Sequence, residues 1–315
     1  MMIALWLAGG LVALYYGAEW LVRGGASLAV RLGVTPLLVG LTVVAFGTSA
    51  PELVVSSVAV LKGQGGIAIG NVVGSNIFNI GIILGLTALV CPLRVQLQLL
   101  KFDAPIMLGV AALFVWFFRD GSIQLAEAVT FLVLIIGYTL INIRLAREQA
   151  SAELEKEFAE GLPAATGSLG KDLGLIVAGL VVLVIGSRLF VVGAVDLARL
   201  LGWSEAVIGL TIVAAGTSLP ELASSLMAAW RRQPDIAVGN VIGSNIYNIL
   251  AILGFSGVLV SPVAGAGVSQ VDSWVMLGIT AVLLPIAWTG FELRRWEGAL
   301  LLVIYGGYLW HLWPK

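Results

Sequence analysis

Two stretches decide the fold of this chain: GLTVVAFGTSAPELVVSS at residues 40–57 and GLTIVAAGTSLPELASSL at residues 209–226. A second pair follows them, IAIGNVVGSNIFNIGIILG at 67–85 and IAVGNVIGSNIYNILAILG at 236–254. In both pairs the second copy lies 169 residues after the first, and 28 of the 46 positions from Gly40 to Gly85 are identical across that offset. Shared apolar composition does not explain so many identities, so the chain contains an internal repeat.

The composition places this repeat in a membrane. Of the 315 residues, 59% are hydrophobic and only 11% are charged, whereas a soluble domain carries roughly 25% charged residues. A transmembrane helix needs roughly 20 mostly apolar residues, and continuous rather than alternating apolar runs favour helices over a barrel. Ten such runs are predicted, at about 2–22, 37–61, 67–90, 104–118, 124–143, 172–195, 206–229, 236–260, 273–290 and 296–313.

The fold class predicted is therefore an all-α polytopic membrane protein with two repeats of five helices, 1–143 and 172–315. The polar stretch 144–171 between them is predicted to be a linker. Because each repeat has an odd number of helices, the second must enter the membrane upside down, a design that recurs in transporters with binding sites at the midplane. The first run lacks a basic leader and an obvious cleavage site, so we expect a retained helix.

The basic residues predict the orientation. With the N-terminus outside, most of the 17 lysines and arginines lie on the inside, as they do in most membrane proteins. Both termini are then outside and the linker is cytoplasmic. The 18 acidic residues nearly cancel the basic ones, so no nucleic-acid partner is expected.

Few side chains suit catalysis or soft metals. Cys91 is the only cysteine and His311 the only histidine, which excludes an internal disulfide, a thiolate cluster and a His-rich metal site. No cofactor is expected. An intramembrane hydrolase would need a base beside its serine, and none is evident.

Glu52 and Glu221 are the main functional candidates, because they occupy equivalent places in the two repeats. A carboxylate at membrane depth costs several kcal/mol unless it is compensated, so it marks a functional site by default. A lone intramembrane glutamate can simply pair with an arginine, but no cation stands at an equivalent position beside these two. Thr48 and Thr217 lie four residues before them, which places hydroxyl and carboxylate on one helix face.

The prolines of the motif predict a break in each helix. Neither Pro51 nor Pro220 can donate to the carbonyl four residues earlier. We therefore expect main-chain oxygens to be released at 45–47 and 214–216, where unpaired backbone is tolerated only if it lines a cavity or holds something.

The second motif adds polar side chains at every fourth position of two helices: Asn71, Ser75 and Asn79, then Asn240, Ser244 and Asn248. Nearby glycines allow another helix to approach closely: Gly70, Gly74, Gly239 and Gly243. Taken singly, such residues more often pack helices than bind ligands.

All of these donors are hard oxygens, which disfavours Zn²⁺, Cu⁺ and Fe. Ca²⁺ accepts roughly six to eight oxygens at 2.3–2.6 Å, whereas Mg²⁺ tends to keep its waters. The two negative charges of the glutamates balance the charge of one Ca²⁺ or of two Na⁺. A site that must bind one ion or the other before it can face the opposite side of the membrane works as an exchanger. A passive channel is the alternative from another class, since broken helices also build filters.

For two further pairs of equivalent residues we predict a structural role. Glu19 and Arg188 are expected to pair with each other, and Asp103 and Asp272 to cap the helices that follow them.

The two motif pairs resemble the α-repeats of the sodium/calcium exchangers, within the cation/Ca²⁺ antiporter superfamily. The resemblance covers both halves of the chain. It implies a ten-helix fold in which helices 2, 3, 7 and 8 form a core with the cation sites, while helices 1 and 6 lie across the core and slide. It also implies a compact prokaryotic-type protein in the inner membrane, with Na⁺ and Ca²⁺ as transported ions.

The resemblance assigns roles to matching residues. Glu52 and Glu221 would hold Ca²⁺, and Thr48 and Thr217 would complete that site through their backbone oxygens. Asn79 and Asn248 would lie at the middle of the cluster. The flanking Na⁺ sites would use the remaining oxygens: Ser49, Ser218, Ser75, Ser244 and the carbonyls of Ala45 and Ala214.

Two related activities stay open as alternatives. Potassium-dependent exchangers are similar but carry an acid where this chain has Asn248. The proton-coupled branch typically carries a Gly-Asn-Ala-x-Glu type of motif in place of Gly-Thr-Ser-x-Pro-Glu. The sequence therefore favours Na⁺ as the driving ion over K⁺-dependent or Ca²⁺/H⁺ exchange, and leaves stoichiometry and oligomeric state undetermined.

Overall fold

The structure is a computed structural model and describes residues 2–149, 168–202 and 214–312. It is predominantly helical, as the composition predicts. The first half contains α1 (Met2–Leu32), α2 (Pro36–Val39), η1 (Gly40–Val44), α3 (Ala45–Thr48), α4 (Ala50–Leu61), α5 (Gly65–Phe78), η2 (Asn79–Leu84), α6 (Gly85–Val90), β1 (Leu93–Arg94), η3 (Leu99–Asp103), α7 (Ala104–Phe117), η4 (Phe118–Asp120), β2 (Ser122–Ile123) and α8 (Leu125–Gln149).

The second half contains α10 (Leu169–Leu200), α12 (Ala214–Gly216), α13 (Leu219–Trp230), α14 (Pro234–Tyr247), η7 (Asn248–Leu253), α15 (Gly254–Leu259), β3 (Val263–Ala264), α16 (Gln270–Trp288), β4 (Glu292–Leu293) and α17 (Arg295–Leu312). Segments η1, η2, η3 and η7 are π-helical, and η4 is a 3₁₀ turn. The two antiparallel strand pairs, β1 with β4 and β2 with β3, each join one half to the other.

Seven helices of the described residues are long and apolar enough to cross a membrane, and eight if the bent pair 36–48 and 50–61 counts as one span. This confirms a multi-pass membrane protein. Of the remaining predicted runs, 296–313 corresponds to α17, and 206–229 begins within 203–213, outside the described residues.

The predicted linker 144–171 lies partly outside the described residues, which omit 150–167. Its two edges are helical, because α8 continues to Gln149 and α10 begins at Leu169.

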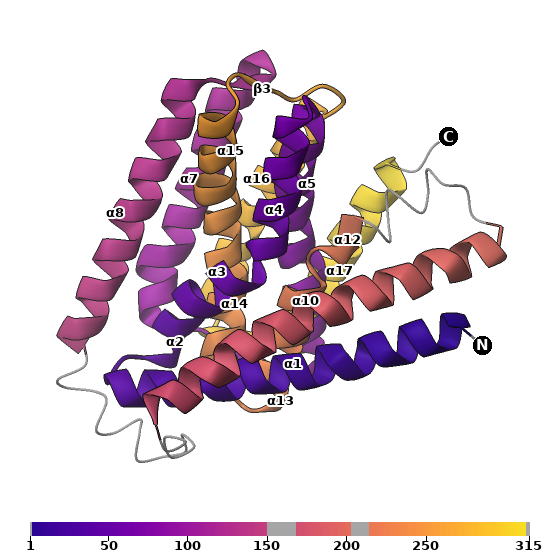
Figure 1. Cartoon of the computed structure of the whole chain (residues 1–315). Coiled ribbons are helices and arrows are strands. Elements are labelled where there is room, and N and C mark those ends of the chain that lie inside the picture. The colour runs from indigo at the N-terminus through magenta and orange to yellow at the C-terminus, as the bar shows by residue number, and fades with distance from the viewer. Residues whose placement is uncertain (1, 150–167, 203–213, 313–315) are drawn as a thin grey trace.

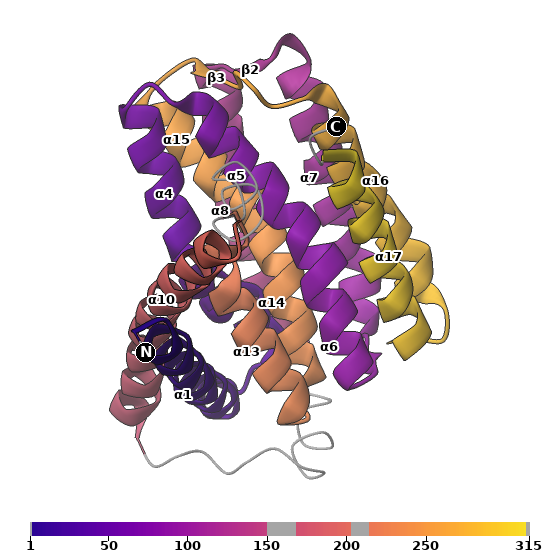
Figure 2. The ribbon, with the colours of Figure 1, turned by 90° about the vertical axis from the view of Figure 1, so that its right-hand side faces the viewer.

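Helices α1 and α10 lie side by side and cross the upright bundle formed by the others (Figures 1 and 2). Glycines bring their backbones into contact. A Cβ on Gly10 would lie 2.6 Å from the amide nitrogen of Phe190, and one on Gly24 would lie 2.9 Å from the carbonyl oxygen of Asp172. Because the early part of α1 meets the late part of α10, the two helices run antiparallel.

The centre of the bundle is formed by α14–α15 and α5–α6. Of their most apolar windows, 94% and 78% are buried inside the protein, against 22% for α1 and 28% for α10. The predicted role of glycines in close packing is wrong for the first repeat: in the described structure a Cβ on Gly74 would meet nothing within 4 Å, and one on Gly70 only a side-chain carbon of Val268 at 3.6 Å. It is confirmed for the second repeat. A Cβ on Gly239 would lie 2.9 Å from the carbonyl oxygen of Leu37, and one on Gly243 would lie 2.6 Å from that of Leu41.

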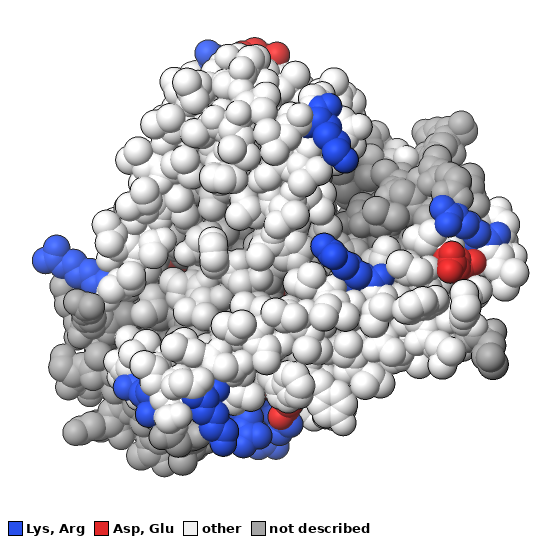
Figure 3. All heavy atoms as spheres, viewed as in Figure 1, with Lys and Arg blue, Asp and Glu red and all other residues white. Residues whose placement is uncertain are grey.

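Ion pairs tie α1 to other elements. Arg31 Nε lies 2.7 Å from the buried carboxylate of Asp172 at the start of α10. The predicted pair between Glu19 and Arg188 is wrong, because Glu19 accepts hydrogen bonds from the guanidinium of Arg231 at the end of α13, against which α1 also packs. Most of the face in Figure 3 is free of charged side chains, and Lys and Arg gather along its lower edge.

The two equivalent aspartates differ. For Asp272 the prediction is right only in part: Ser269 is the N-cap of α16, and Asp272 lies in the first turn of that helix, where its carboxylate accepts a hydrogen bond from the Ser269 N–H in a capping box. For Asp103 the prediction is wrong: the chain is already helical there, and the buried carboxylate accepts a hydrogen bond from the Tyr138 hydroxyl at 2.9 Å.

Candidate cation site

The two predicted breaks position the glutamates. The helix pair 36–48 and 50–61 bends by 42° at Ser49, and Ser49 and Ser218 share a non-helical conformation (φ −80°, ψ 3° and φ −89°, ψ 7°). Pro51 and Pro220 stand in the first turn of the helix that follows, where a missing N–H costs nothing. Glu52 and Glu221 therefore lie in the first turns of α4 and α13, near the positive ends of these helix dipoles.

Each glutamate is held by the other repeat. Ser218 donates to Glu52 Oε1 at 3.0 Å, and Ser49 donates to Glu221 Oε1 at 3.0 Å. The Ser75 hydroxyl lies 3.1 Å from that of Ser218. The two carboxylates, which are 169 residues apart in the chain, thus belong to one constellation.

Both carboxylates are fully buried, with 0% and 1% of Glu52 and Glu221 exposed. Within the described part of the chain, neither forms an ion pair with a lysine, arginine or histidine. The second oxygen of each, Oε2, is buried without a hydrogen-bond partner. A buried, unpaired carboxylate costs several kcal/mol, so this arrangement needs a cation or a proton.

Amide and hydroxyl oxygens extend the unpaired set. Asn79 Oδ1, Asn248 Oδ1 and Ser244 Oγ are also buried without a hydrogen-bond partner. Asn79 and Asn248 each begin a π-helical segment, η2 and η7, and such segments occur often at functional sites. Segment η2 packs against α13 and η7 against α4, so each segment that begins with one of these asparagines lies beside a helix that carries a glutamate.

The predicted threonines and the first asparagines connect the repeats. Thr48 donates to Asn240 Oδ1 at 3.1 Å, and the half-buried Thr217 donates to Asn71 Oδ1 at 3.4 Å. Asn240 Nδ2 lies 3.4 Å from the carbonyl oxygen of Glu221, and Asn71 Nδ2 the same distance from that of Glu52. These contacts fix the broken helices to α14 and α5.

The expected release of main-chain oxygens differs between the copies. For Ala45 the expectation is wrong, because its carbonyl accepts from Ser49 N–H at 3.0 Å and lies 3.4 Å from the Thr48 hydroxyl. In the second copy the equivalent hydrogen bond is shifted by one residue. Ser218 N–H donates to the carbonyl of Ala215 at 3.2 Å, whereas the residue equivalent to Ala45 is Ala214. That equivalent, Ala214, begins α12, next to 203–213, which lie outside the described residues.

Sequence reasoning missed Asn76 and Asn245. They lie three residues before Asn79 and Asn248 and are buried. Asn76 accepts a hydrogen bond from Asn248, and Asn245 accepts one from Asn79. Their identity across the 169-residue offset was the available signal, but their spacing from the other polar residues does not reveal which side chains they contact.

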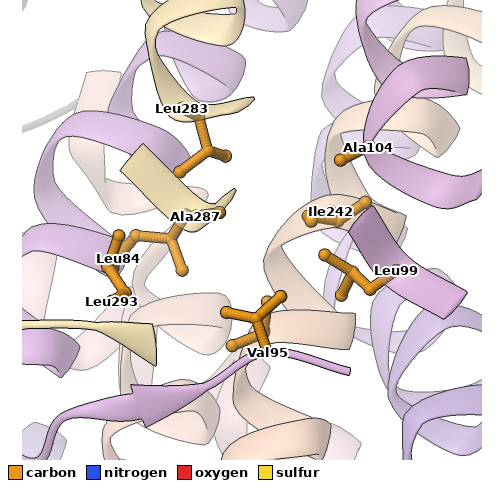
Figure 4. A pocket seen from close by; sticks show the side chains of 9 residues that line it. Leu84, Val95, Leu99, Ala104, Ile242, Leu283, Ala287 and Leu293 are labelled. Carbon is orange, nitrogen blue, oxygen red and sulfur yellow. The ribbon is translucent and has the colours of Figure 1, made fainter. Parts of the chain in front are cut away.

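A small apolar gap elsewhere in the bundle is no cation site. It measures about 10 Å³ and is lined only by apolar side chains, among them Leu84, Leu99, Ile242 and Leu283 (Figure 4). Water needs polar partners to occupy such a space, and a cation needs them more.

Within residues 2–149, 168–202 and 214–312, no three His, Cys, Asp or Glu residues cluster, so oxygens of other kinds must complete any site around the two glutamates.

Comparisons with known proteins agree with this arrangement. The family described as "Sodium/calcium exchanger protein" matches residues 2–144 and again 171–313. The sodium/calcium exchanger MaX1 of Methanosarcina acetivorans is 38% identical over 337 aligned residues, covering 95% of both chains. The inner membrane protein YrbG of Escherichia coli is 36% identical over 282 residues, covering 89% of this chain and 86% of that protein. A solved structure of the sodium-calcium exchanger NCX_Mj superposes with a TM-score of 0.84 at 33% identity and covers 99% of each chain.

Proposed function

The chain belongs to the sodium/calcium exchanger family, and on that premise we propose that it exchanges Na⁺ for Ca²⁺ by alternating access, with both ions competing for one oxygen site at the midplane. The observation that carries the proposal is the pair of fully buried glutamates, each bonded to a serine of the other repeat and each with one unpaired oxygen.

Charge explains the competition. Glu52 and Glu221 together supply two negative charges without a protein cation paired to them in the described structure. One Ca²⁺ or two Na⁺ neutralise that charge equally. Ca²⁺ also needs roughly six to eight oxygens, and the unpaired amide oxygens of Asn79 and Asn248 are suitable additional donors.

We propose the ligands that the family motif implies, and the buried oxygens without a hydrogen-bond partner on Glu52, Glu221, Asn79, Asn248 and Ser244 support this set. Glu52 and Glu221 hold Ca²⁺, with Thr48 and Thr217 completing its site and Asn79 and Asn248 in the middle of the cluster. The flanking Na⁺ sites use Ser49, Ser218, Ser75, Ser244 and the carbonyls of Ala45 and Ala214. The Ala45 carbonyl already accepts a backbone hydrogen bond, so in its proposed role the second lone pair of this oxygen faces the cation.

We also propose ten transmembrane helices in two inverted repeats, 1–143 and 172–315, joined by a cytoplasmic linker at 144–171. One observation supports the repeat and another supports its inversion. The family matches the chain twice, with both boundaries displaced by the same 169 residues that separate the sequence motifs. The equivalent helices α1 and α10 run antiparallel, as inversion requires.

The proposed movement is a displacement of α1 and α10 across the core. Both are mostly exposed to the surroundings of the protein, whereas α5 and α14 are mostly buried. The backbones of α1 and α10 touch at glycines along their length, so the two would move as one unit. Ser187 of α10 donates to the carbonyl of Gly216 at 2.5 Å, which gives this unit a direct contact with the second break.

For location we propose a prokaryotic cytoplasmic membrane with both termini outside. The basic residues support the orientation, and the relative YrbG is named as an inner membrane protein.

Transport into proteoliposomes tests the proposal. Vesicles loaded with Na⁺ should accumulate ⁴⁵Ca²⁺ when Na⁺ outside is low, and Glu52→Gln or Glu221→Gln should abolish this uptake. Asp103→Asn is the matched control, because it removes an equally buried intramembrane carboxylate outside the site and should leave uptake near the wild-type rate.

Other outcomes would overturn the proposal in different ways. Uptake driven by a pH step and indifferent to Na⁺ would indicate a Ca²⁺/H⁺ antiporter, and a requirement for K⁺ would indicate the potassium-dependent class. Ca²⁺ flux without any counter-ion would indicate a channel.

A further inference from the structure

Asn76 and Asn245 face each other where α5 and α14 cross, and both are buried. Asn76 Nδ2 lies 3.2 Å from the carbonyl oxygen of Asn245, and Asn245 Nδ2 lies 3.5 Å from that of Asn76. Each Nδ2 also lies 3.6 Å from a methionine sulfur, that of Met276 or Met107. Backbone carbonyls and thioethers can only accept, so the amide nitrogens must point toward them and the amide oxygens must point away.

The orientation of the Asn76 and Asn245 amides determines that of the Asn248 and Asn79 amides. Asn248 Nδ2 donates to Asn76 Oδ1 at 3.0 Å, and Asn79 Nδ2 donates to Asn245 Oδ1 at 3.0 Å. With their nitrogens used in this way, Asn248 and Asn79 must direct their own Oδ1 atoms elsewhere. Both of these oxygens are buried without a hydrogen-bond partner, on segments that pack against the helices of the two glutamates.

We propose that Asn76 and Asn245 are positioning residues for cation binding, which lock the amides of Asn248 and Asn79 so that each presents oxygen, not nitrogen, to the site. This inference rests on the proposed function, because it assigns how two of its proposed ligands are oriented. Asn76 and Asn245 themselves do not touch the cation.

The lock matters because of the charge nearby. An unrestrained Asn248 amide can turn its N–H groups toward a buried carboxylate oxygen, which is a strong acceptor. That hydrogen bond would occupy the oxygen the cation needs and place positive hydrogens beside the cation. Holding the nitrogen on Asn76 removes this competing arrangement before the cation arrives, as preorganisation does in binding sites generally.

Double-mutant cycles on the purified full chain test the proposal, with CaCl₂ binding measured by isothermal titration in Na⁺-free buffer. Asn76→Ala should weaken Ca²⁺ binding about tenfold, or about 1.4 kcal/mol. In an Asn248→Ala background the same change should cost less than twofold, because the amide it orients is gone. In an Asn79→Ala background it should still cost about tenfold. Asn245→Ala should show the reverse pattern, coupled to Asn79 and independent of Asn248.

A purely structural role predicts something different, namely equal losses in all backgrounds. Such additivity, or an Asn76→Ala protein with wild-type affinity, would overturn the inference. If Asn76→Ala is not monodisperse, Asn76→Ser provides the same cycle with a smaller packing defect. Should the wild type bind Ca²⁺ and Glu52→Gln fail to, additive cycles would count against the positioning role alone. A wild type that binds no Ca²⁺ would overturn both proposals.

Discussion

The substitution Gly243→Ala tests whether close contact between α14 and the first broken helix sets the geometry of the site. A Cβ at this position would lie 2.6 Å from the carbonyl oxygen of Leu41 and 2.7 Å from the Cβ of Ala45. Ordinary van der Waals contact begins near 3.4 Å. Neither neighbouring atom is the end of a flexible side chain, so one of the two backbones must move by most of an ångström.

The energetic cost follows from this overlap. Inserting a methyl group into a packed interior costs about 1–3 kcal/mol, and alanine recovers about 1 kcal/mol over glycine in a helix. The net loss of stability should therefore be about 0–2 kcal/mol. The effect on binding should be clearer, because the moving segment leads into Thr48, whose hydroxyl lies 3.1 Å from Asn240. A shift of that size breaks this hydrogen bond, and a typical hydrogen bond contributes about 1 kcal/mol. We expect this loss to fall on the Ca²⁺-bound state, which lowers Ca²⁺ affinity about fivefold.

Calorimetric titration with Ca²⁺ and thermal unfolding in detergent provide the two measurements. Gly278→Ala is the matched control, because in the described structure a Cβ there meets nothing within 4 Å. That variant should bind Ca²⁺ like the wild type and melt no lower. If Gly243→Ala also keeps wild-type affinity and melts with the control, the contact between α14 and η1 does not hold the site and the reasoning is refuted.

Three further outcomes are expected. Thr48→Val leaves the buried Oδ1 of Asn240 without its donor, so unfolding should become easier by about 1–3 kcal/mol, and an unchanged melting temperature would contradict the assigned bond. Arg231→Gln removes the ion pair with Glu19, but half of the arginine side chain is exposed to solvent. Solvent screening therefore limits the loss of stability to about 0–1 kcal/mol, and the exchange rate should fall less than about fivefold. A total loss of exchange would assign this arginine a larger role. Finally, raising Na⁺ should weaken apparent Ca²⁺ binding while equal K⁺ should not, and a comparable response to K⁺ in the same titrations would exclude a site with selectivity for Na⁺.

Much of the local structure follows from residue order. The apolar runs predict a polytopic membrane protein, and the paired motifs predict two equivalent glutamates at membrane depth. The prolines predict a break, and the helix bends at Ser49, two residues before Pro51. These features are readable because they depend on composition and on short-range backbone geometry.

The contacts between the copies are not readable in this way. Spacing places Thr48 on the same helix face as Glu52, but the side chain that bonds the Glu52 carboxylate is Ser218, from the other repeat. In the same way, Glu19 meets Arg231 and not the predicted Arg188. The sequence alone determined that two acidic groups would need compensation inside the membrane. Only the tertiary structure decided which oxygens surround them, because helix periodicity relates residues within one turn or two, whereas these hydrogen bonds depend on how two distant segments cross.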